Sequence, residues 1–287
     1  MDQAQLALVR VWLPRVIIAM MVEAAPAMSG AVFQGLFKNP VVSPNILGTT
    51  SGASFGAALG IMVGAAAVGI QLFAFLGGLV AVLLVAGMNA AVSKRAQSIA
   101  TLILCGMLVS SLFSALVSLL NFVADTETQL PAITFWLMGS LAGTMLSDLS
   151  MLYLFLPVAG LLLAVRWKVN LLALGDDEAR MLGVNVRFYR WLIIGCATLL
   201  TSLSVSVAGA IGWVGLVVPH LARMLVGPNY GRLLPASLSL GASFLLVVDT
   251  VARMLFTVEV PLGILTAIIG APFFFILLLR AKKGFIS

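Results

Sequence analysis

Nine apolar stretches, most of them about twenty residues long, divide this chain and constrain its fold more than any other feature. They lie at roughly 11–37, 51–69, 71–92, 99–121, 147–165, 191–209, 211–226, 233–256 and 262–280. A helix of about 20 residues crosses roughly 30 Å of hydrocarbon, because each residue adds about 1.5 Å. The sequence therefore predicts an all-α polytopic integral membrane protein with about nine transmembrane helices, forming a single domain over residues 1–287.

Composition agrees with a membrane-spanning chain and argues against a soluble one. Apolar residues make up 62% of the sequence, charged residues only 9%, and the mean hydropathy is +1.16. A soluble protein has about a quarter of its residues charged and could not cover its surface with so few. The net charge of +6 comes from cations between the apolar stretches, a pattern typical of membrane-protein loops rather than nucleic-acid surfaces. We therefore expect membrane lipid, and no nucleic acid, as a partner.

The stretch at 211–226 is shorter than most and contains Gly212, Gly215 and Pro219. Such a segment predicts a half-helix or a steeply tilted helix, which is tolerated at membrane depth only where other protein covers its backbone. Small residues also recur at 51–60, and small residues let membrane helices approach closely. These two features predict a tightly packed helix bundle.

The distribution of Lys and Arg predicts one orientation in the membrane. If the loop at Lys38 is cytoplasmic, successive crossings place thirteen of the sixteen cations on that side. The N-terminus then lies outside and the C-terminus in the cytoplasm. The cations left on the outer side are Arg10, Arg15 and Arg253, and the acidic residues there are Asp125, Glu127, Asp148 and Glu259.

Few residues are suited to enzyme chemistry. His220 is the only histidine, and a lone histidine needs Cys or carboxylate neighbours to hold zinc. Cys105 and Cys196 each lie inside an apolar stretch, which favours packing residues over a disulfide. The sequence has no Gly-x-x-x-x-Gly-Lys-Ser/Thr phosphate loop. We expect no enzyme activity, no metal and no cofactor in this chain, and any ATP that drives transport to be bound by another chain.

The most informative polar segment, within about 171–190, has the features of a short helix. Acidic residues follow a glycine, where they complement a helix N-terminus, and a second glycine can end the helix after about two turns. A helix this short is not stable alone in water, so it must pack on something. One interpretation is a structured loop, and the other is a coupling helix that fits a groove of a cytoplasmic motor. The residues are Gly175, Asp176, Asp177, Glu178, Arg180 and Gly183.

Ionisable residues within the apolar stretches are functional candidates, because charge is costly inside a membrane. Glu23 lies in the middle of the first stretch, and it is either a hydrogen-bonded structural acid or an acid that faces a cavity. Asp249 and Arg253 are four residues apart, so a helix would bring them together as an ion pair. The outer cations Arg10, Arg15 and Arg253 either extend to lipid headgroups or bind carboxylates of a soluble partner.

Several motifs follow one another from about residue 10 to the C-terminus. They are Leu13-Pro14-Arg15 and the segments 29–40, 44–48, 51–53, 172–184, 209–223, 249–253 and 261–273. In this order they resemble the iron–siderophore and cobalamin permease family, which are the membrane subunits of type II ABC importers. The resemblance implies the type II importer permease fold and a location in the bacterial inner membrane.

The resemblance also implies partners and site residues. The partners are a second copy of the chain, two ATPase subunits that bind ATP and Mg²⁺, and a periplasmic protein that delivers the substrate. The segment at 175–183 would couple to the ATPases, and Arg10, Arg15 and Arg253 would dock the periplasmic protein. The inner gate aligns with Gln97, Ser98, Ile99, Ala100 and Thr101, and the helix that follows would line the pathway with Ser110, Ser111, Ser114 and Ser118.

The chain departs from the family pattern in three respects. Family members have ten helices, and the first precedes the Leu-Pro-Arg motif and is not in this sequence, so we expect either a truncated N-terminus or a true start that lies upstream. Trp12 stands where relatives often carry another Arg. Glu23 and Pro26 replace residues that are usually small or apolar, and Pro26 should kink its helix.

We therefore expect a permease subunit that imports a metal chelate (ferric siderophore, haem or cobalamin) or an oxyanion such as molybdate, driven by ATP hydrolysis in partner chains. The alternative is an ion-gradient-driven secondary transporter that uses Glu23 and Asp249 as proton or cation sites. A membrane-embedded enzyme would need clustered acid, base or metal ligands, which the sequence does not offer. The sequence does not decide among the substrates, since its thirteen Met residues are scattered through apolar helices as packing residues.

Overall fold

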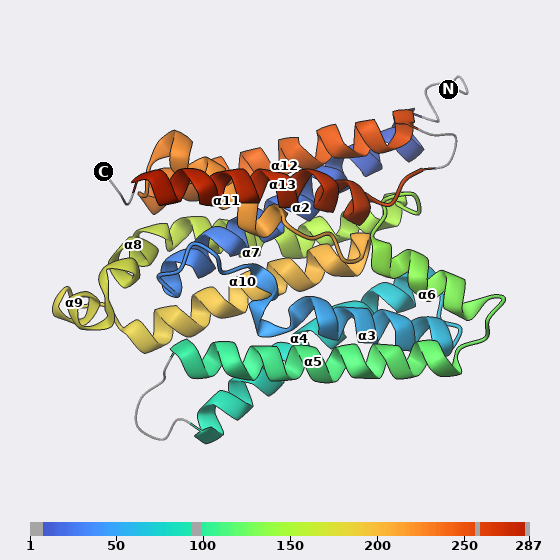
Figure 1. The fold of residues 1–287 in the computed structure, drawn as a ribbon, viewed down its shortest axis with the longest axis horizontal. Coiled ribbons are helices and arrows are strands. Elements are labelled where there is room, and N and C mark those ends of the chain that lie inside the picture. Colours follow the sequence, from blue (N-terminus) through green and yellow to red (C-terminus); the bar gives the residue numbers. More distant parts are fainter. Residues whose placement is uncertain (1–7, 93–98, 256–258, 285–287) are drawn as a thin grey trace.

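The computed structural model describes residues 8–92, 99–255 and 259–284, and within these ranges the chain forms helices and no strand (Figure 1). The helices are η1 (Leu8–Trp12), α2 (Leu13–Leu36), η2 (Pro44–Leu47), α3 (Thr49–Met62), α4 (Ala67–Val92), α5 (Ile99–Val123), α6 (Gln129–Met138), η3 (Leu146–Met151), α7 (Leu152–Ala164), α8 (Arg166–Leu174), α9 (Asp176–Met181), α10 (Val186–Ala208), α11 (Val214–Val226), α12 (Tyr230–Leu255) and α13 (Leu262–Gly284).

Every predicted apolar stretch contains a helix, which confirms the all-α membrane fold. Six helical segments are long and apolar enough to cross a membrane: Val9–Leu36, Ala67–Val92, Ala100–Val123, Leu146–Ala164, Val186–Ala208 and Tyr230–Met254. By contrast, α3 has 14 residues and α11 has 13, so each extends only about 20 Å. The predicted half-helix at 211–226 is confirmed as α11, whereas the shortness of α3 and the separate helix α6 were not foreseen.

Helix α2 lies at the centre of the bundle, where it packs against α10, α11 and α12. Within the apolar segment Val9–Leu36, which contains α2, 78% of the part long enough to cross a membrane is buried inside the protein. The corresponding value for Ala67–Val92, which forms α4, is 28%. Large apolar side chains on the helices at the periphery of the bundle are exposed, among them Leu83 of α4, Phe122 of α5 and Tyr153 of α7. An apolar surface of this kind suits contact with lipid rather than water.

Small residues allow the closest helix contacts, as the stretch at 51–60 predicted. A Cβ atom on Gly52 of α3 would lie 2.4 Å from the carbonyl oxygen of Gly77 in α4. A Cβ on Gly30 of α2 would lie 1.7 Å from the carbonyl oxygen of Gly215, next to the start of α11. Only glycine fits at these contacts, because the two backbones touch directly.

Pro26 lies inside α2, and its backbone has no N–H to donate to the carbonyl of Val22 one turn earlier. The hydroxyl of Ser204 in α10 donates to that carbonyl instead, at 2.5 Å. This hydrogen bond keeps a polar group satisfied at a fully buried position. It explains how the core helix accommodates a proline that the sequence alone left unexplained.

The two ends of the bundle differ in the segments they carry (Figure 1). Helices α8 and α9 form what we call the coupling end, and Lys38 joins it by donating from Nζ to the carbonyl oxygen of Leu174 at 2.7 Å. The opposite end, which we call the outer end, carries the start of α2, the end of α12 and the α3–α4 turn. Arg15 lies near the start of α2 and Arg253 near the end of α12. The structure thus places Lys38 at the same end as the cation-rich 166–190 segment, as the predicted orientation requires.

Candidate functional site

The segment from Gly175 to Gly183 forms a short helix, as predicted. Helix α9 begins after Gly175, whose φ is +155°, and ends before Gly183, whose φ is +74°. The three acidic residues Asp176, Asp177 and Glu178 occupy its first turn, where they complement the partial positive charge of the helix N-terminus. Glycine is required at both ends, since positive φ is strained for other residues.

Helix α9 is held on the bundle from one side only. The carboxylate of Asp176 accepts a hydrogen bond from the guanidinium of Arg190 in α10, and Ala179 is fully buried. On the other side Arg180 and Asp177 form a 3.1 Å pair whose side chains are 64% and 82% exposed. A helix anchored on its inner face and charged on its outer face is suited to contact a second protein.

Apolar side chains surround this helix on the same surface. Met181 is 87% exposed, and Leu182, Phe188 and Trp167 are also exposed. A cavity of about 400 Å³ lies next to them and is lined by Asn185, Arg187, Phe188, Trp191 and Leu192. Exposed apolar residues rimmed by charges mark interaction surfaces.

The predicted gate is described only in part. Gln97 and Ser98 lie outside the described residues. Helix α5 begins at Ile99, and Ala100 is exposed while Thr101 is half-buried. These positions stand at the first turn of α5, and their role in gating stays a prediction.

The predicted pathway serines lie on two faces of α5. Ser110 packs against Gly48, where an added Cβ would meet its hydroxyl at 3.2 Å. Ser114 lines a cavity of about 180 Å³ together with hydroxyl-bearing residues of α3. Ser111 and Ser118 are exposed. The residues of α3 that join Ser114 at this cavity are Thr50, Ser51 and Ser54.

The α3 hydroxyls were missed because the 51–60 stretch was interpreted only as a packing surface. The available signal was the interruption at Pro44–Gly48. Gly48 adopts φ +76°, and α3 begins directly after it. A helix that starts inside the bundle turns its first-turn hydroxyls towards a neighbouring helix at that depth.

Two of the three outer cations, Arg15 and Arg253, belong to one linked cluster of ion pairs. Arg15 of α2 binds Asp249 of α12 at 2.8 Å and both carboxylate oxygens of Glu259 at 2.9 Å. Arg253 binds Asp249 at 3.2 Å, which confirms the predicted pair, and its guanidinium stacks over the ring of Trp12 at 4.5 Å. We call Arg15, Asp249, Arg253 and Glu259 the outer-end ion cluster.

Exposure separates the three cations at this end. The side chain of Arg15 is only 11% exposed and that of Arg253 is 20% exposed, while Arg10 lies in η1 with an exposed side chain. Arg10 and the partly exposed Arg253 can therefore be reached from outside, although Arg253, like Arg15, binds a carboxylate of its own chain.

Glu23 is completely buried in α2, and no described residue gives a hydrogen bond to either of its carboxyl oxygens. Asp249, the other acid considered for ion coupling, is bound by both Arg15 and Arg253. The described residues therefore do not bring Glu23 and Asp249 together in one ion-binding site. Cys105 and Cys196 are buried free thiols.

Comparison with known proteins identifies close relatives. The model of the FecCD transport family matches residues 1–280. The molybdate import system permease protein MolB of Haemophilus influenzae is 46% identical, covering 96% of this chain and 81% of its own. The cobalamin import system permease protein BtuC of Halobacterium salinarum is 41% identical, covering 96% and 74%. A probable iron chelatin transport system permease protein of Helicobacter pylori is 40% identical, covering 94% and 81%.

Solved structures show the same architecture. An inward-facing metal-chelate type ABC transporter superposes with a TM-score of 0.91 at 44% identity, covering 98% of this chain and 90% of that one. PsaBC from Streptococcus pneumoniae, in complex with a Fab, superposes with a TM-score of 0.64 at 19% identity, covering 94% and 92%. At that identity the second likeness concerns the fold alone.

Proposed function

Because this chain belongs to the FecCD transport family of ABC importer permeases, we propose that it forms the membrane pathway of an ATP-driven importer in the bacterial inner membrane. It moves a metal chelate, or an oxyanion such as molybdate, from the periplasm to the cytoplasm. The chain itself hydrolyses nothing. Two ATPase subunits bind ATP and Mg²⁺ at its cytoplasmic coupling end.

The observation that carries this proposal is the one-sided attachment of α9. Arg190 and Lys38 fix α9 and the preceding α8 to the bundle, so a push on α9 is passed to α10 and to the loop after α2. The exposed face presents Asp177, Arg180 and Met181 to a partner. Movement of this helix by the ATPases biases the bundle between outward-open and inward-open states.

A second copy of the chain completes the pathway. Helix α5 exposes Leu104, Leu108 and Leu112 on a face that also carries Ser111 and Ser118. Hydroxyls on a face turned to lipid gain no partners outside their own helix. Contact with a second α5 would enclose the hydroxyl-lined groove between α3 and α5 and leave the leucines packed against protein.

The outer-end ion cluster supports docking of a periplasmic binding protein. Arg10 and Arg253 offer accessible positive charge to its carboxylates. Arg15 joins that contact when its bonds to Glu259 open, since Glu259 is 36% exposed and Asp249 only 3%.

The relatives favour two substrate classes. The permease named for molybdate is 46% identical and the one named for iron chelatin 40%. An oxyanion and a metal chelate differ greatly in size, so the binding protein that delivers the substrate discriminates between them. Its ligand, measured by calorimetry with molybdate, ferric siderophore, haem and cobalamin, identifies the cargo.

Uptake into proteoliposomes tests the energy source. The chain is reconstituted with its ATPase and binding protein. Substrate uptake is then followed with ATP supplied on the side of the vesicle membrane where the ATPase lies. Uptake should require ATP and should persist when ionophores collapse all ion gradients. Uptake that needs no ATPase and disappears with the gradient would instead establish a secondary transporter.

Two matched variants keep this test specific. Glu23→Gln removes the buried acid that a secondary transporter would use, and it should leave ATP-driven uptake largely intact. Arg180→Glu reverses the exposed charge of α9 and should abolish uptake while ATP is still hydrolysed. The opposite pattern, with uptake lost only in Glu23→Gln, would overturn the proposal.

A further inference from the structure

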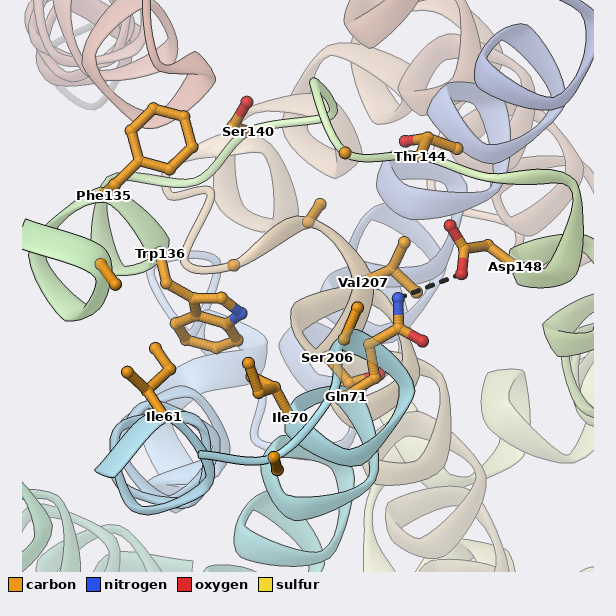
Figure 2. A pocket seen from close by; sticks show the side chains of 16 residues that line it. Ile61, Ile70, Gln71, Phe135, Trp136, Ser140, Thr144, Asp148, Ser206 and Val207 are labelled. Carbon is orange, nitrogen blue, oxygen red and sulfur yellow. Dashed lines mark hydrogen bonds between the residues drawn. The ribbon is translucent and has the colours of Figure 1, made fainter. Parts of the chain in front are cut away.

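A buried carboxylate at the outer end stands between two cavities. Asp148 of η3 is 5% exposed and lies in the wall of both. The first cavity, of about 380 Å³, has Phe135 and Trp136 on the side opposite Asp148 (Figure 2). The second, of about 320 Å³, runs between α4 and α7. Gln71 of α4 also lies in both walls and donates to Asp148 at 3.1 Å.

The carboxylate of Asp148 has hydrogen bonds but no counter-ion among the described residues. One oxygen accepts from Gln71 and the other from the backbone N–H of Met145 at 2.7 Å. Of the outer cations, Arg15 and Arg253 are bound to other carboxylates. A buried charge without a partner is costly, so this site is complementary to a cation that enters from outside the chain.

The second cavity indicates what carries that cation. Val68, Leu72 and Leu154 line it and are 64%, 56% and 37% exposed, so it opens on the apolar surface that faces lipid. The hydroxyl-bearing residues Ser147 and Ser150 line it close to Asp148. Along one groove the structure thus offers a carboxylate, hydroxyls and then apolar side chains.

We propose that this groove binds a phospholipid with a primary amine headgroup, of the phosphatidylethanolamine class. Its ammonium group donates to Asp148 and to the side-chain carbonyl of Gln71, which uses its N–H for Asp148. Its phosphate and glycerol oxygens face Ser147 and Ser150, and an acyl chain follows Leu72 and Leu154. The predicted orientation places the outer end of the bundle at one face of the membrane, where lipid headgroups meet the hydrocarbon.

This chemistry distinguishes the lipid from its common neighbours. Phosphatidylcholine has a quaternary ammonium with no N–H to donate, so it cannot hydrogen-bond to the carboxylate. Phosphatidylglycerol has a net negative charge, which Asp148 repels. The site should therefore select by headgroup when the acyl chains are identical.

Native mass spectrometry of the purified chain tests the proposal with these three lipids, each carrying the same acyl chains. Phosphatidylethanolamine should be retained about tenfold more than either of the others, as expected for one charge-assisted hydrogen-bonded contact. Asp148→Asn keeps an acceptor for Met145 and should reduce retention of phosphatidylethanolamine to the level of phosphatidylcholine. Asp125→Asn, which removes an exposed carboxylate from the same end, should change nothing.

A second pair of variants covers the case in which Asp148→Asn does not fold. Leu154→Trp fills the groove from a lipid-exposed position, and Leu161→Trp places the same side chain two turns along α7 at a position that is also exposed. Only the first should release the lipid. Equal retention of the three headgroups, or release by both tryptophans alike, would overturn the assignment. None of these readouts depends on transport, so failure here would leave the proposed import function untouched.

Discussion

The coupling end and the outer end both concentrate charged residues, but they use them in different ways. At the outer end, Arg15, Asp249, Arg253 and Glu259 neutralise one another, and Asp249 is only 3% exposed. At the coupling end the Arg180–Asp177 pair lies open to solvent. Breaking a buried ion pair strongly destabilises the fold, whereas an exposed ion pair contributes little to stability. The buried Arg15–Asp249 pair is therefore part of the fold, while the charges of α9 are fully available to a partner.

Removing Arg15 tests this difference with the largest expected effect. Among the described residues, Arg15→Met leaves Asp249 buried with one partner and takes the Arg15 guanidinium away from Glu259. It should therefore cost about 3–5 kcal/mol of unfolding free energy. The measurement is the thermal unfolding of the detergent-purified chain. A loss of less than about 1 kcal/mol would mean that the cluster behaves like a surface pair.

Replacing Gly183 tests the end of α9. Proline fixes φ near −65° and cannot adopt the +74° observed here, and it removes the bond from the Gly183 N–H to the carbonyl of Arg180. Gly183→Pro should cost about 1–3 kcal/mol locally and uncouple ATP hydrolysis from uptake, with insertion into the membrane intact. Parallel assays of ATPase activity and uptake check this result. Normal uptake in the variant would argue against the coupling role.

Ser204 tests the interior between the two ends. Ser204→Ala leaves the buried carbonyl of Val22 without its donor, so it should cost about 1–3 kcal/mol. Combining it with Pro26→Ala restores a backbone N–H one turn after Val22, and the loss should then disappear. A double-mutant cycle on thermal stability measures the coupling. Additive effects would show that the hydroxyl does not replace the missing helix bond.

Reversing Arg180 should have the smallest effect on stability. Its side chain is 64% exposed, so Arg180→Glu should change the unfolding free energy by no more than about 0.5 kcal/mol. Its consequence should be seen only in transport, where uptake is lost. A stability loss comparable to that of Arg15→Met would remove the distinction between the two ends.

Local patterns in the sequence predicted what local physics determines. The apolar stretches predicted the helices, and the glycines at 175 and 183 predicted the limits of α9. The four-residue spacing of Asp249 and Arg253 predicted their ion pair. Each of these depends on residues that are close together in the chain. Helix α6 escaped prediction because its ten residues are too few for a membrane stretch.

Contacts between distant segments could not be predicted in this way. Glu259 lies 244 positions from Arg15, and Ser204 lies 182 positions from Val22. Nothing near Pro26 in the sequence shows which helix will supply the missing donor. The cavity between Ser114 and the α3 hydroxyls likewise depends on which helices pack together, and on a break at Pro44–Gly48 that shortens α3.

Helix α2 connects the two ends that the charges distinguish. Its 24 residues form a rod of about 36 Å, clamped at one extremity by the guanidinium of Arg15 and tied, just beyond the other, by the ammonium of Lys38. Because α2 is held at both ends, a tilt at its coupling end displaces its outer end as well, unless the helix bends between them. The backbone hydrogen bonding of α2 is interrupted at Pro26. There the hydroxyl of Ser204 in α10 supplies the missing donor and stabilises the helix where it would otherwise bend most easily.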